Sequence, residues 1–130
     1  MLAVVALAGC KGPSIEAIQA KYPDRKIYKL AEGRIATNQP VGDLIVRWVD
    51  LGRTPSGSLS ASVNYRSTSP TKVAPSVKVT LYDAKGTVLA EEMVVGHVMA
   101  DLLPGETGNT SDVIPVPVNL QPVAFSLAPR

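Results

Sequence analysis

The residue best suited to acid–base chemistry in this chain is its one histidine, His97. A Ser-His-acid triad requires an imidazole within hydrogen-bond reach of the nucleophilic hydroxyl. His97 follows Gly96 in the segment Val-Val-Gly-His-Val, and no nucleophile motif lies near it. We therefore expect His97 at a strand end or a bulge marked by Gly96. A hydrolase that uses His97 with a distant acid is the lesser alternative.

The carboxylates and the thiol form no recognisable metal or catalytic pattern. The chain has one cysteine, too few for an internal disulfide or a cysteine-rich zinc site. Glu91 and Glu92 are adjacent, so on a strand they would point to opposite faces instead of acting as an acid–base pair. The aspartates lack the spacing of a calcium loop: Asp43, Asp50, Asp83, Asp101 and Asp112. No Gly-rich phosphate loop is present. The sequence predicts no catalytic residues, no metal site and no cofactor.

Three aromatic residues, Trp48, Tyr65 and Tyr82, are candidates for binding a partner. Trp48 lies in the segment 44–51, which is apolar on both faces apart from Arg47 and Asp50 and is therefore expected at a central position or under a loop. The simplest expectation for Trp48 is a core anchor, and an exposed binding aromatic is the alternative. The aromatics stand among mixed charges and the net charge is +2, so we expect no nucleic-acid partner.

The elements that would position these residues are short runs with a period of two, bounded by Gly, Pro, Asn and Ser. In the clearest run, 58–66, apolar residues at alternate positions indicate one buried and one solvated face. A second run over 77–82 leads into the turn Asp83–Gly86 and returns over 87–95, which predicts a hairpin. Further candidate strands cover 27–30, 34–37, 44–51, 98–102, 110–118 and 123–127.

Composition and strand number together predict the fold class. The 130 residues are 45% hydrophobic and 18% charged, which is typical of one domain with a packed core. Seven or eight strands with almost no helical period favour an all-β, immunoglobulin-like antiparallel β-sandwich of about seven strands over 26–130. Pro115 and Pro117 cannot donate to a ladder, so 113–118 is expected as an edge strand or an extended crossover. A weak helix or spacer precedes the domain, starting near Pro13-Ser14 and ending before Tyr22-Pro23.

The first ten residues have a different character from the rest of the chain. Nine uncharged, mostly apolar residues precede Cys10, and the run ends in Leu7-Ala8-Gly9-Cys10 and is too short to span a bilayer. The run is typical of an export signal, and its last four residues resemble the lipobox of bacterial lipoproteins. A buried N-terminal strand with an ordinary cysteine is the alternative.

The lipobox resemblance implies a lipid anchor and a location. It implies cleavage between Gly9 and Cys10, with acyl chains such as palmitate on Cys10. Several chains together hold a protein stably on a membrane. Residues 1–9 would then be the remnant of a signal peptide, and 10–25 a lipid-anchored linker or short helix. Lys11 replaces the Asp of the inner-membrane retention signal of enteric bacteria, which favours the outer membrane, facing the periplasm.

A second resemblance lies in the predicted hairpin. The segment 77–88, with Leu-Tyr-Asp-Ala-Lys-Gly at its centre and Leu-Pro-Gly-Glu following at 103–106, resembles the FxLYD-type immunoglobulin-like domains and the YcfL-like periplasmic lipoproteins. The resemblance covers roughly 44–127. It implies a β-sandwich without catalytic residues, with turns defined by Asp83, Gly86, Pro104 and Gly105.

These observations favour a non-catalytic, lipid-anchored envelope protein that serves as a protein-binding or assembly module in the periplasm. We expect a membrane contact through the acyl chains on Cys10 and an envelope protein as partner. Sheet edges, the Ser-rich segment 56–69 and the Pro-rich segment 113–122 are candidate contact regions. A carrier of a small lipid or sugar is the alternative, and it requires a large apolar cavity between the sheets.

Overall fold

The computed structural model describes residues 15–96, 100–117 and 119–130, which form one short helix and eight strands. The helix α2 spans Ile15–Lys21. The strands are β1 (Tyr28–Lys29), β2 (Gly33–Val41), β3 (Leu44–Arg53), β4 (Leu59–Ser67), β5 (Val77–Tyr82), β6 (Val88–Val95), β7 (Thr107–Ile114) and β8 (Ala124–Ala128). His97, Gly9 and Cys10 lie outside the described residues.

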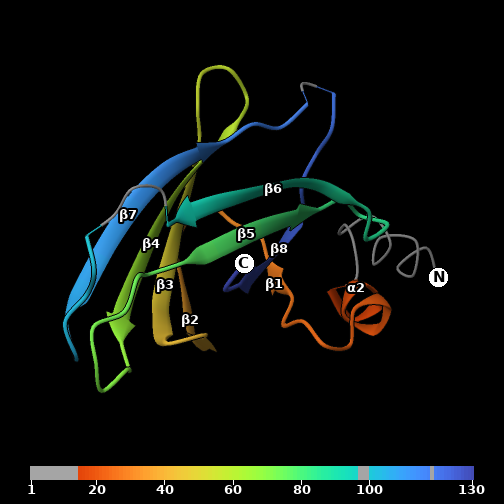
Figure 1. The fold of residues 1–130 in the computed structure, drawn as a ribbon. Helices are drawn as coiled ribbons and strands as arrows, with labels where there is room; N and C mark the ends of the chain where they lie inside the picture. Colours follow the sequence, from red (N-terminus) through yellow and green to blue (C-terminus); the bar gives the residue numbers. More distant parts are fainter. Residues whose placement is uncertain (1–14, 97–99, 118) are drawn as a thin grey trace.

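The strands form two four-stranded antiparallel sheets packed face to face (Figure 1). One sheet has the order β1-β8-β5-β6, and the other has the order β2-β3-β4-β7. We call them the first and the second sheet. The predicted all-β sandwich is confirmed.

Alternation along the strands places one face of each sheet in a common core. In β4, Leu59, Ala61, Val63 and Tyr65 are buried between the sheets, as their spacing predicted. Leu81 and Phe125 supply large side chains from the first sheet. The ring of Tyr65 lies over Gly108, its partner on β7, and the Tyr65 hydroxyl is 2.8 Å from the Thr110 Oγ1. Gly108 therefore makes room for the largest core side chain of the second sheet.

The two predicted turns adopt the geometry that their residues favour. The Asp83 carboxylate accepts hydrogen bonds from the backbone N–H groups of Lys85 and Thr87, and Gly86 has a φ of +83°. In the second turn, the backbone N–H of Glu106 donates to the Leu103 carbonyl at 3.0 Å, and Gly105 has a φ of +77°. Positive φ favours glycine, so both turns depend on local sequence.

Some expected strands differ in extent from the observed ones. β1 has two residues, and the predicted strand 34–37 extends to Val41. In the predicted strand 98–102, residues 98 and 99 lie outside the described residues, and Leu102 forms an isolated bridge with Val73. β7 ends at Ile114, directly before Pro115, and lies at the edge of its sheet as the prolines predicted.

The described part of the predicted linker is packed against the sandwich. Ile18 of α2 is buried with Ile27, Tyr82 and Ala124 on the outer side of the first sheet. Tyr22 packs on Tyr82 with ring centroids 5.1 Å apart, and its hydroxyl donates to the Gly86 carbonyl at 2.6 Å. Residues before 26 therefore already contact the sandwich, and α2 covers part of the first sheet.

Polar contacts complete this cover. The Arg25 Nη1 donates to the Tyr82 hydroxyl at 2.7 Å, and that hydroxyl is 2.7 Å from the Ser126 Oγ. The hydrogen bond to Tyr82 raises the pKa of the Arg25 guanidinium. Every polar atom named here has a partner, which allows Tyr82 to be fully buried.

The close approach of Tyr65 and Gly108 gives a stability prediction. A Cβ at position 108 would lie 2.5 Å from the Tyr65 ring, so Gly108→Ala should lower the free energy of unfolding by about 1–3 kcal/mol. Gly52→Ala is the matched control, because a Cβ at Gly52 on β3 meets nothing within 4 Å. We expect it to change stability by no more than about 1 kcal/mol. Urea unfolding of both variants checks this, and equal stability of the two would contradict the packing described.

Candidate functional site

A bulge at the centre of the second sheet determines which side chains it exposes. On β3, Val46 pairs with Tyr65 of β4 and Trp48 pairs with Asn64, so Arg47 is an extra residue. On the β2 side, Ala36 pairs with Trp48 and Gln39 pairs with Val46, so two residues lie opposite Arg47. These two residues are Thr37 and Asn38. The irregularity therefore runs through both pairings of β3.

Residues 37 and 38 hold the bulge in place. The hydroxyl of buried Thr37 donates to the Val46 carbonyl at 2.8 Å. Asn38 has a φ of +45°, a conformation that asparagine tolerates better than most residues with a side chain. The hydroxyl thus satisfies a carbonyl at the interrupted part of the ladder.

The bulge reverses the alternation of β3. Leu44 and Val46 are buried before it, and Val49 and Leu51 are buried after it. Val46 and Val49 are each 0% exposed, three positions apart in sequence. Arg47 and Trp48 therefore both point to the outer face of the sheet. The expectation of Trp48 as a core anchor is wrong, although β3 is central in its sheet as predicted.

Two guanidinium groups lie over the partly exposed indole of Trp48. The Arg34 Cζ is 4.1 Å from the ring centroid and the Arg47 Cζ is 4.8 Å away. The Arg34 Nε is also 3.9 Å from the Asp50 Oδ2. Cation–π contacts at exposed sites contribute about 0.5–1 kcal/mol each, enough to favour this arrangement without fixing it rigidly.

Polar side chains of β4 and β7 continue the surface. The hydroxyls of Ser62 and Ser111 are hydrogen-bonded across the strands, and the Asn64 Nδ2 donates to the Asn109 Oδ1 at 3.3 Å. The Asn64 Oδ1 is buried without a hydrogen-bond partner in the described structure. Exposed Arg66 follows on β4, opposite Ile45 of β3.

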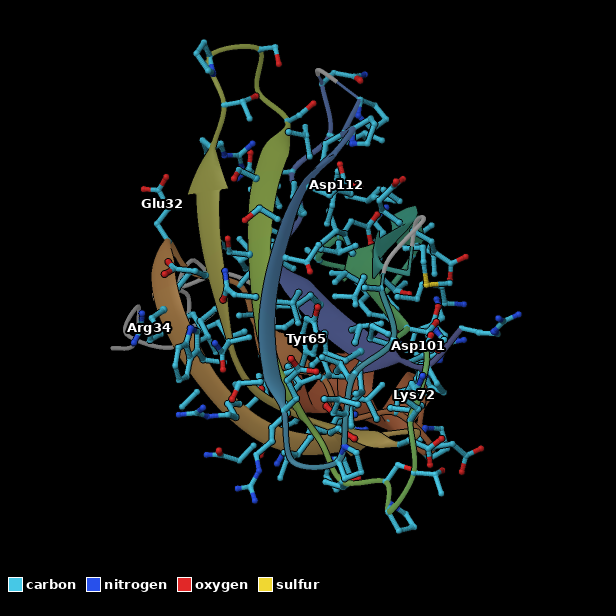
Figure 2. All side chains as sticks on the ribbon, turned by 60° about the vertical axis from the view of Figure 1, so that its left-hand side comes forward. Glu32, Arg34, Tyr65, Lys72, Asp101 and Asp112 are labelled. Atoms are coloured by element: carbon cyan, nitrogen blue, oxygen red, sulfur yellow. The ribbon has the colours of Figure 1, made fainter. Side chains whose placement is uncertain are left out.

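We call this outer surface of the second sheet the arginine face. It is defined by Trp48, Arg34, Arg47, Arg66 and the polar pairs Ser62–Ser111 and Asn64–Asn109. Figure 2 shows Arg34 on the outer side of this sheet, whereas Tyr65 lies on its inner side.

The other aromatic candidates are placed differently. Tyr65 and Tyr82 are 1% and 0% exposed, so neither ring is available to a partner. Tyr28, which was not a candidate, is half-buried, and burial raises its pKa. Its ring stacks on that of Phe125, with the ring centroids 5.1 Å apart. Trp48 is the one candidate binding aromatic that the fold leaves accessible in part.

The acidic residues form no catalytic cluster in the described structure. Glu91 interacts with Thr80 and Lys78, its neighbours on the outer face of the first sheet. No group of three or more His, Cys, Asp or Glu side chains that could hold a metal occurs among the described residues. His97 and Cys10 lie outside this part of the chain, so the structure places neither of them.

Two surface hollows lie at strand ends and loops. One, of about 410 Å³, is lined by residues 29–32, Arg53 and residues 121–123. The other, of about 260 Å³, is lined by residues 41–44, residues 73, 74 and 76, and the last two residues of the chain. Segments from or next to both sheets line each hollow, and the second hollow includes Val41 and Leu44 from the edge of the core.

Comparison with known proteins identifies no relative. No protein-family model, curated protein or solved structure matches the chain significantly. Within the described residues, none of the helical structure has the length and apolar character that a membrane crossing requires. A function for this chain therefore has to be inferred from its own residues.

The bulge predicts how β3 responds to a shorter chain. Deleting Arg47 leaves Val46 and Val49 two positions apart, so a regular strand still buries both valines and exposes Trp48. Deleting Asp50 instead makes Val49 and Leu51 adjacent, so one of these two buried side chains leaves the core. We expect the Asp50 deletion to lower the free energy of unfolding by about 2–4 kcal/mol, and the Arg47 deletion to lower it by clearly less. Denaturant unfolding measures both, and an equal loss of stability from the two deletions would refute the phase change.

Proposed function

We propose that this protein is a non-catalytic, lipid-anchored protein of the bacterial envelope whose β-sandwich binds another envelope protein. Acyl chains on Cys10 would hold it to the outer membrane, with the domain in the periplasm. The arginine face would be the contact surface.

The partly exposed Trp48 between two guanidinium groups carries this proposal. Tryptophan and arginine are enriched among the residues that dominate protein–protein binding energy, because they combine large apolar area with directional polar contacts. A bulge that turns both Arg47 and Trp48 outward concentrates these residue types at one place on an open sheet. The surrounding Ser and Asn side chains suit the polar rim of such a contact.

The position of α2 is compatible with an anchor that leaves this surface free. The helix lies against the first sheet, whereas the arginine face belongs to the second (Figure 1). A tether that enters the domain through α2 therefore leaves Trp48 accessible to a partner.

The filled core argues against the carrier alternative. A carrier needs an apolar cavity between the sheets. Here that space holds bulky buried side chains from both sheets, including Tyr65, Leu81 and Phe125. The described hollows are open at strand ends and are partly lined by charged residues.

The anchor predicts a change in cell fractionation. Cys10→Ser removes the thiol that would carry the lipid, so the full-length protein should leave the membrane fraction. Mass spectrometry of the unaltered protein from its own cells should show a chain that begins at Cys10 with attached acyl groups. A Cys10→Ser protein that stays on the membrane as before, or an unaltered protein without lipid, would contradict the anchor.

Site-directed photo-crosslinking in cells tests the contact surface. A photoreactive side chain at exposed Asn109, on the arginine face, should give a discrete cross-linked product with another protein. The same group at exposed Lys85, in the β5–β6 turn, is the control and should not give this product. Trp48→Ala in the Asn109 background should abolish the product while the protein level stays unchanged. A product independent of Trp48, or the same product from position 85, would argue against this surface.

A further inference from the structure

The arginine face has an unbalanced charge. Three of its strands each present one arginine: Arg34, Arg47 and Arg66. The carboxylate of Asp50 pairs with Arg34. Within the described residues, neither Arg47 nor Arg66 forms an ion pair. Two guanidinium groups therefore have no anionic partner in the described fold.

The strand register brings these two guanidinium groups to neighbouring positions. Arg66 pairs with Ile45 on β3, and Asn64, two residues before Arg66 on the same face, pairs with Trp48. Arg47 projects to the same face from the bulge between those two pairings. Like charges at neighbouring positions of a sheet are unfavourable, so a bound anion would relieve their repulsion.

We propose that the arginine face binds an acidic segment of a protein partner. Its carboxylates would pair with Arg47 and Arg66 while the Arg47 guanidinium stays over the Trp48 ring. Guanidinium groups suit this role because they bind carboxylates in a bidentate manner and keep their charge at all physiological pH values. This inference rests on the proposed function and specifies the chemistry of the partner.

The arrangement around Trp48 favours an acidic peptide over a glycan. In this structure two guanidinium groups already lie over the indole ring. A sugar that stacked on the indole would have to displace them, whereas a carboxylate can approach while they stay in place. The Asn64 Oδ1, which has no hydrogen-bond partner in the described structure, lies in the same cross-strand row and can accept a backbone N–H that reaches it. A peptide supplies such a donor.

The single tryptophan of the chain allows direct measurement. Titration of the full-length protein with a short oligoglutamate peptide at low salt should change the Trp48 emission in a saturable way. The double variant Arg47→Ala, Arg66→Ala should bind at least about tenfold more weakly. The charge-matched control Lys72→Ala, Lys85→Ala removes two exposed lysines from outside this face and should bind like the unaltered protein. Figure 2 labels Lys72 well away from Arg34.

Several outcomes would overturn the inference. These are equal weakening by both double variants, no saturable emission change, or tighter binding of an oligogalacturonate or of single-stranded DNA than of the peptide. Vesicles of anionic phospholipid could also be added at the same concentration of negative charge as the peptide. If they displaced the peptide, the face would be assigned to a membrane. A partner cross-linked at position 109 in a Trp48-dependent way would still support the proposed function in each of these cases, so the two failures are distinguishable.

Discussion

The extra residue at Arg47 is the constraint on which the arrangement of this domain depends. A strand with strict alternation cannot bury both Val46 and Val49, because residues three apart point to opposite faces. The bulge resolves this conflict, and Thr37 supports it by donating to the Val46 carbonyl. As a result, one strand supplies the core with valines and leucines at both ends and presents Arg47 and Trp48 to solvent at its centre.

The two sheets use their outer faces differently. The first is covered in part by α2, where Tyr82 is buried beneath Tyr22 and bonded to Arg25 and Ser126. The second has no such cover in the described structure, and its outer face carries Trp48, arginines, serines and asparagines. Because α2 packs on the first sheet, it does not cover the second, so the proposed contact surface and the proposed anchor do not compete.

Local chemistry explains what the sequence could predict. The turns at Asp83–Gly86 and Pro104–Gly105 depend on residues within a few positions of each other, and alternation in β4 needs no knowledge of its neighbours. The orientation of Trp48 could not be predicted from alternation alone, because it depends on residues of β2 as well as β3. A signal was nevertheless present in the sequence, because apolar residues stand at 44 and 46 and again at 49 and 51, and the second pair is shifted by one residue relative to the alternation of the first. The docking of α2 was missed for a similar reason, since Tyr22 finds its contacts far along the chain.

The fluorescence of Trp48 in the unaltered protein reports whether the indole faces outward, because no other tryptophan contributes. An outward-facing indole flanked by guanidinium groups should emit between the wavelengths of buried and fully hydrated tryptophan and be quenched by acrylamide at an intermediate rate. A blue-shifted emission that resists acrylamide would place the indole in the core and would contradict both the phase change of β3 and the arginine face.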